Sequence, residues 1–62
     1  MDSLSVFKRK SLASAVAVVS RKLGCGDLEA VSKMQATAAR NGNESLLEDL
    51  CAYKNILIED LQ

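Results

Sequence analysis

Few side chains in this 62-residue chain could take part directly in catalysis, since it has no histidine and only two cysteines. Cys25 follows basic residues and precedes an expected helix start, a setting in which a thiol can become nucleophilic. A reactive or redox-sensing Cys25 is therefore one alternative, and an inert residue in a turn is the interpretation we favour. Cys51 lies on an apolar stripe, where a cysteine usually serves as a small buried hydrophobe.

Other kinds of site lack their required residues. Two thiols do not complete a tetrahedral metal site, and residues 24–26 lack the flanking strand, third glycine and Lys-Ser/Thr pair of a phosphate-binding loop. The acidic pairs Glu48/Asp49 and Glu59/Asp60 are neighbours in sequence, so their side chains point to different sides of a helix. We predict that the protein is not an enzyme and binds no metal or cofactor.

Basic residues cluster near the start of the chain, although the net charge is zero. Residues 1–23 contain five basic residues and one acidic residue, whereas residues 43–62 contain one basic and five acidic residues. The five basic residues are Lys8, Arg9, Lys10, Arg21 and Lys22. On one helix they would span about 20 Å, comparable to a stretch of phosphates. A dimeric nucleic-acid-binding regulator is therefore the alternative function, although only Phe7 among them could stack on a base.

The chain has no proline, and its three glycines, Gly24, Gly26 and Gly42, mark two breaks. The segments between them have a helix-forming composition. We predict an all-α, single small domain over residues 1–62, with helices at about 3–23, 27–40 and 44–61.

Capping residues support these boundaries. Asp2 or Ser3 could cap the first helix, Asp27 the second and Asn43 the third, because their side chains accept hydrogen bonds from free amides. Gly24 suits the left-handed position after a helix.

The first helix carries two adjacent apolar stripes. One stripe consists of Leu4, Phe7, Ser11, Ala15 and Val18, and the other of Leu12, Val16, Val19 and Leu23. An ordinary amphipathic helix buries one stripe, so this helix is expected to be either central in the monomer or a seam between subunits.

The third helix has a one-sided pattern that includes a second candidate seam, formed by Leu50, Lys54, Leu57 and Leu61. Lys54 lies in the middle of this apolar stripe. It either extends its charged end to water along an apolar stem or fixes helix register by pairing with a carboxylate.

A domain of this size buries only about 60% of its unfolded surface and usually needs additional stabilisation. Because the composition favours neither a disulfide nor a metal as that support, we predict a homo-oligomer. The expected function is a non-enzymatic protein–protein interaction module, such as an adaptor, assembly factor or regulatory inhibitor. Its predicted interface consists of Leu12, Val16, Val19, Leu23, Leu50, Lys54, Leu57 and Leu61.

The apolar run over residues 12–19 is closed by Arg21 and Lys22. It lacks a cleavage site and is far shorter than the ~20 apolar residues of a membrane span. We therefore expect a soluble, cytoplasmic protein without a membrane partner.

Overall fold

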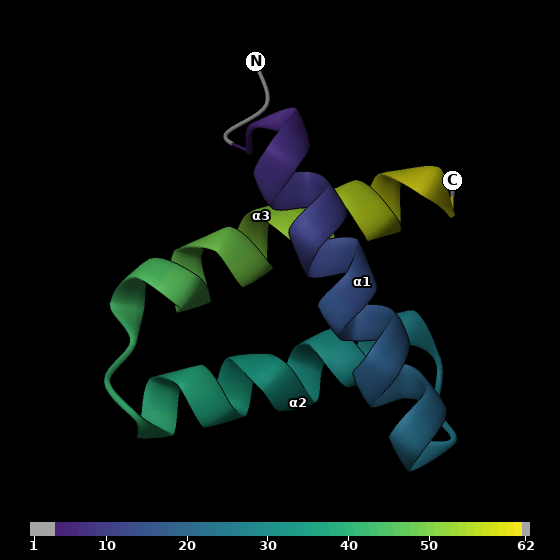
Figure 1. The fold of residues 1–62 in the computed structure, drawn as a ribbon, viewed down its shortest axis with the longest axis horizontal. Helices are drawn as coiled ribbons and strands as arrows, with labels where there is room; N and C mark the ends of the chain where they lie inside the picture. Colours follow the sequence, from purple (N-terminus) through teal and green to yellow (C-terminus); the bar gives the residue numbers. More distant parts are fainter. Residues whose placement is uncertain (1–3, 62) are drawn as a thin grey trace.

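Three helices make up the fold in the computed structural model, which describes residues 4–61. They are α1 (Val6–Leu23), α2 (Asp27–Arg40) and α3 (Glu44–Asp60). Helices α2 and α3 run in opposite directions as a hairpin, and α1 lies across one face of this pair (Figure 1). The all-α, three-helix prediction is confirmed.

The first helix begins later than predicted. It starts at Val6 instead of near residue 3, because the Ser5 hydroxyl oxygen accepts a hydrogen bond from the Lys8 backbone N–H at 3.1 Å. The predicted caps Asp2 and Ser3 lie outside the described residues. Leu4, just before the cap, is buried against the core, so the chain turns inward before the helix begins.

The connection between α1 and α2 is fixed by backbone geometry. Gly24 is left-handed, with φ 64°, as predicted for the residue after a helix. The backbone N–H of Cys25 donates to the Ser20 carbonyl at 3.1 Å, and the Ser20 hydroxyl donates to the Cys25 carbonyl. The predicted cap Asp27 is wrong: Gly26 is the N-cap, and Asp27 is the first residue of α2. Its carboxylate still lies near the positive end of the helix dipole.

The connection between α2 and α3 has the predicted cap. The Asn43 side-chain oxygen accepts a hydrogen bond from the Leu46 backbone N–H at 3.2 Å. Gly42 supplies a second left-handed position, with φ 70°, and the Asn43 backbone N–H donates to the Ala38 carbonyl at 2.9 Å. Two residues that favour turns therefore reverse the chain within a few residues.

The core lies where the three helices meet. Its buried side chains are Leu4, Leu12, Val16, Ala30, Val31, Ala38, Leu50 and Tyr53. The largest fully buried ones are Leu50, Val16 and Val31, one from each helix. Contact is most extensive between α2 and α3 and least extensive between α1 and α3, which leaves α1 partly uncovered along its length.

We expect Leu50→Ala to destabilise the protein by about 2–5 kcal/mol, because it opens a cavity in a fully buried position. That loss is comparable to the whole stability of a domain this small. Leu23→Ala is the matched control, since Leu23 is 54% exposed and should lose only about 1 kcal/mol. Urea unfolding followed by circular dichroism, at one fixed protein concentration, measures both. Equal losses in the two variants would contradict the placement of Leu50 at the centre.

Candidate interaction surfaces

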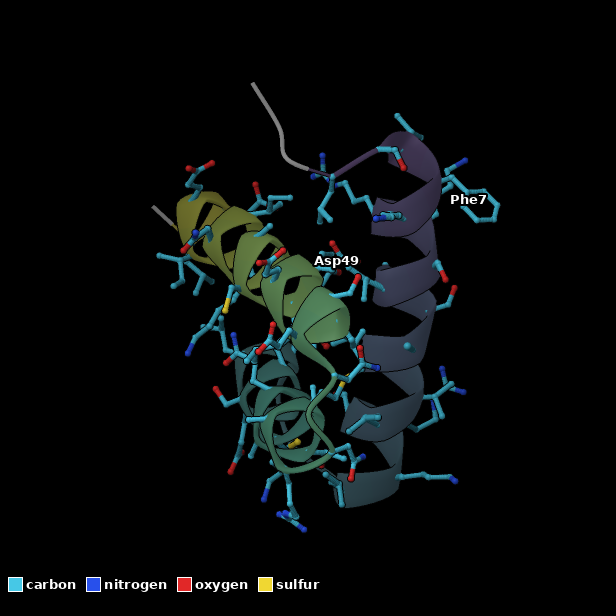
Figure 2. All side chains as sticks on the ribbon, turned by 90° about the vertical axis from the view of Figure 1, so that its left-hand side faces the viewer. Phe7 and Asp49 are labelled. Atoms are coloured by element: carbon cyan, nitrogen blue, oxygen red, sulfur yellow. The ribbon has the colours of Figure 1, made fainter. Side chains whose placement is uncertain are left out.

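The side of α1 that points away from α2 and α3 carries two large apolar side chains separated by small residues. This outer face is defined by Phe7, Ser11, Ser14, Ala15 and Val18, all of which are exposed. Phe7 is 83% exposed and Val18 is 52% exposed, and Figure 2 shows Phe7 pointing away from the other two helices. The face therefore has an apolar side chain at each end and a flat middle.

The outer face contains most of the first apolar stripe, and the second stripe is the one that α1 buries. Phe7 and Val18 belonged to the expected pattern but were not among the residues assigned to an interface. Serine and alanine lie between them, and neither residue type is strongly apolar. The sequence pattern therefore did not indicate an interface here, and the exposure of this face follows from the arrangement of the helices.

The first predicted seam faces inward. Leu12 and Val16 are buried in the chain's own core, and Val19 is half-buried against it. Only Leu23 is largely exposed. Leu12 and Val16 therefore form part of the chain's own core cluster.

The second predicted seam is divided along α3. Leu50 is fully buried, Lys54 and Leu57 are half-buried, and Leu61 is 73% exposed. Within residues 4–61, Lys54 has no carboxylate within 4 Å. Exposure therefore increases toward the C-terminal end of α3, where the helix extends beyond α1 (Figure 1).

The basic residues of α1 lie on different sides of the helix. Lys8 faces α3 and forms an ion pair with Asp49 at 3.6 Å, and Figure 2 shows Asp49 between the two helices. Arg9 and Lys10 line a groove on another side of α1. At about 100° per residue, Arg21 lies close to the direction of Lys10. The cations therefore do not form one continuous stripe.

Two grooves flank the C-terminal half of α3. The α1–α3 groove has a volume of about 310 Å³ and is lined by Val6, Arg9, Lys10, Ala13, Tyr53, Ile56, Leu57 and Asp60. The α2–α3 groove has a volume of about 370 Å³ and is lined by Gly26, Asp27, Leu28, Leu57, Asp60 and Leu61. Both combine apolar side chains with charged edges, a composition suited to binding a protein surface.

A third, largely apolar groove lies at the other end of the fold, between the end of α1, α2 and the start of α3. Its volume is about 330 Å³, and its lining comprises Val19, Leu23, Lys33, Met34, Thr37, Ala38, Asn41, Asn43 and Leu46. Lys33 is its one charged lining residue among those described. Its largely apolar lining could receive an apolar side chain.

The two cysteines differ from expectation in one respect. Cys51 is exposed, not buried as predicted, and its sulfur accepts a hydrogen bond from the Gln35 side-chain amide at 3.3 Å. One helical position from buried Leu50, it lies at the edge of the α3 apolar stripe. Cys25 is half-buried and packs against the core.

Residues 4–61 contain no group of three or more cysteine, aspartate or glutamate side chains placed to hold a metal ion. In the same part of the chain, none of the helices has the length and apolar character needed to cross a membrane. Comparison with protein-family models, curated proteins and solved structures finds no match to this chain. The exposed surfaces described above are therefore the features of the molecule that bear on its function.

A thiol titration tests the roles of the two cysteines. Under native conditions a disulfide reagent should modify exposed Cys51 promptly and half-buried Cys25 more slowly, because access limits attack on the reagent. The variants Cys51→Ser and Cys25→Ser separate the two rates. If Cys25 reacted much faster than free cysteine, a reactive or redox-sensing Cys25 would be favoured over an inert turn residue, and the requirement for an enzyme would be met.

Proposed function

We propose that this protein is a small, non-enzymatic protein–protein interaction module that acts as a homo-oligomer and presents the outer face of α1 to a protein partner. An adaptor, assembly factor or regulatory inhibitor would work in this way. The observation that supports it is the exposure of Phe7 and Val18 on one face of α1, opposite the stripe that contributes Leu12 and Val16 to the core. Exposed apolar patches on small proteins commonly mark binding sites.

The surroundings of the outer face indicate the chemistry of the partner. Lys10 and Arg21 lie on one flank, and Lys22 lies near the other, all exposed. A partner helix with an apolar stripe and acidic flanks would cover Phe7 and Val18 and meet these cations. Binding of an amphipathic helix to an apolar surface is a common mode of recognition, and flanking charges mainly set orientation and association rate.

The same cations argue against pairing of two outer faces. In an antiparallel pair, residues 8–10 of one helix would approach residues 21 and 22 of the other, and both ends are basic. In a parallel pair, each cation would approach its own copy. Like charges in contact are unfavourable, so the partner of this face is a different, acidic surface.

We also propose that the protein is soluble and located in the cytoplasm. Its support is compositional, because small secreted domains are usually rich in disulfides, whereas this chain has two cysteines.

A designed peptide tests the outer face directly. An amphipathic helical peptide with leucine on one side and flanking glutamates should bind, and its NMR shift changes should centre on the outer face. Phe7→Ser with Val18→Ser should weaken binding by about tenfold or more, because these are the large apolar anchors. Leu23→Ser is the matched control, since it removes an exposed apolar side chain elsewhere.

A second peptide, with lysine in place of glutamate, controls for apolar attraction alone. Equal binding of both peptides, or no effect of the double substitution, would count against an acidic partner at this face. Circular dichroism of the variants checks that the helices remain formed.

The alternative, a nucleic-acid-binding regulator, is weakened by the placement of its residues. Lys8 pairs with Asp49, and Arg9 and Lys10 share their groove with Asp60, so three of the five cations have a carboxylate on the same surface. We expect no retention on duplex DNA or RNA at about 50 mM salt. Retention that decreases steeply with salt, and disappears in K8A/R9A/K10A, would instead favour the nucleic-acid function.

A further inference from the structure

We propose that two copies of this chain associate about a twofold axis through the surface formed by the two grooves beside the C-terminal half of α3. We call this surface the α3 corner, and its residues are those that line the α1–α3 and α2–α3 grooves. The inference rests on the proposed function in one respect, namely that the protein is a homo-oligomer. It adds the surface, the symmetry and the charged residues that would pair.

The two grooves form one continuous surface. Leu57 and Asp60 line both of them. Figure 1 shows the end of α3 extending to one side of α1, above the connection between α1 and α2. That end forms a ridge with a groove on either side. A ridge flanked by grooves allows two copies of the same surface to interlock.

Exposed apolar side chains lie on both sides of the ridge. Val6, on the α1–α3 groove, and Leu61, on the α2–α3 groove, are each 73% exposed. The groove beside Val6 also contains Ala13 and Ile56, so much of its lining is apolar. Leu61 of one copy would enter this groove in the other copy, and the twofold axis would repeat the contact. Both exposed side chains would then be covered by a single interface.

The charges of the α3 corner are arranged to complement a second copy of itself. Arg9 and Lys10 lie on its α1 edge, whereas Asp27 lies on its α2 edge and Asp60 on the ridge. None of these four forms an ion pair shorter than 4 Å within residues 4–61. With the twofold axis parallel to the end of α3 and on its α1 side, the ridge of each copy would enter the α1–α3 groove of the other, and the α1 edge of one copy would lie against the α2 side of the other. Arg9 and Lys10 of each copy would therefore meet the aspartates of the other.

This arrangement distinguishes the α3 corner from the outer face of α1. The outer face has only cations on its flanks and needs an acidic partner, whereas the α3 corner carries both signs. A surface that carries both signs on opposite edges needs no other molecule to neutralise it, so a second copy is the occupant that fits.

Two charge-reversal variants of the full chain test the proposal by sedimentation equilibrium. Arg9→Glu with Lys10→Glu makes the α3 corner acidic throughout, and Asp27→Lys with Asp60→Lys makes it basic throughout. Each variant alone should have a dimer dissociation constant raised by at least about tenfold, because like charges then meet across the axis. An equimolar mixture should recover association, as a heterodimer with every charged contact attractive.

Control variants carry the same change of charge away from the α3 corner. Arg21→Glu with Lys22→Glu matches the first variant, and Glu44→Lys with Glu48→Lys matches the second, including one position in the first turn of a helix. These controls should sediment as the unmodified protein does. Circular dichroism on each sample confirms that the helices are retained, and Leu61→Ser provides an uncharged test that should also weaken association.

The outcomes separate this inference from the proposed function. If the unmodified chain stays at 6.7 kDa at all concentrations, then the homo-oligomer itself is wrong and the inference fails with it. If the chain associates but the reversed variants behave as their controls do, or their mixture shows no recovery, then the α3 corner is not the interface. Binding of the acidic peptide is measured separately on the unmodified chain, and its test depends on Phe7 and Val18, which do not line the α3 corner.

Discussion

The close packing of α2 against α3 is the contact on which the other features of the fold depend. Ala30 and Ala38 are buried between the helices, and their small side chains let the two backbones approach each other. Leu50 of α3 and Val31 of α2 fill the remaining space. Larger apolar side chains of the hairpin, such as Met34, Leu46 and Leu57, are only partly buried, and α1 completes the core through Leu12 and Val16.

That constraint determines which surfaces remain exposed. A helix lying across a hairpin can bury only the side that faces it, so α1 buries Leu12 and Val16 and exposes Phe7 and Val18. The ends of the hairpin extend beyond the crossing helix, which exposes the C-terminal end of α3. The outer face of α1 and the α3 corner are therefore both consequences of one crossing arrangement, although they differ in charge and in the partners they suit.

Much of the fold could be predicted from sequence because local signals determine it. Gly24 and Asn43 occupy the positions their chemistry favours. The second and third helices lie between the breaks that the glycine residues predicted. The predicted start of the first helix and the predicted Asp27 cap were wrong. Adjacent residues can each occupy a capping position, and contacts with the rest of the fold determine which of them does. Leu4 is an example, since its burial draws the chain inward before Ser5.

The surfaces were harder to predict because periodicity identifies apolar stripes but not what covers them. Leu12 and Leu61 have the same residue type and similar local patterns, yet one is in the core and the other is 73% exposed. The difference depends on where α1 crosses the hairpin, which is set by helix packing and by two short connections. The Lys8–Asp49 ion pair shows the same dependence, since it joins residues 41 positions apart that no sequence spacing relates.

The exposure of Phe7 is the feature of α1 that the proposed binding of a partner would explain. Fully burying a phenylalanine would stabilise a protein by about 1.5–3 kcal/mol, a large fraction of what a domain of this size can gain. The chain has one phenylalanine, and within residues 4–61 it is the most exposed of the large apolar residues, whereas Ala30 and Ala38 lie in the core. A partner that covers Phe7 would supply the missing stabilisation, since a ligand that binds only the folded state raises its stability. Folding and binding would then be coupled through the same helix.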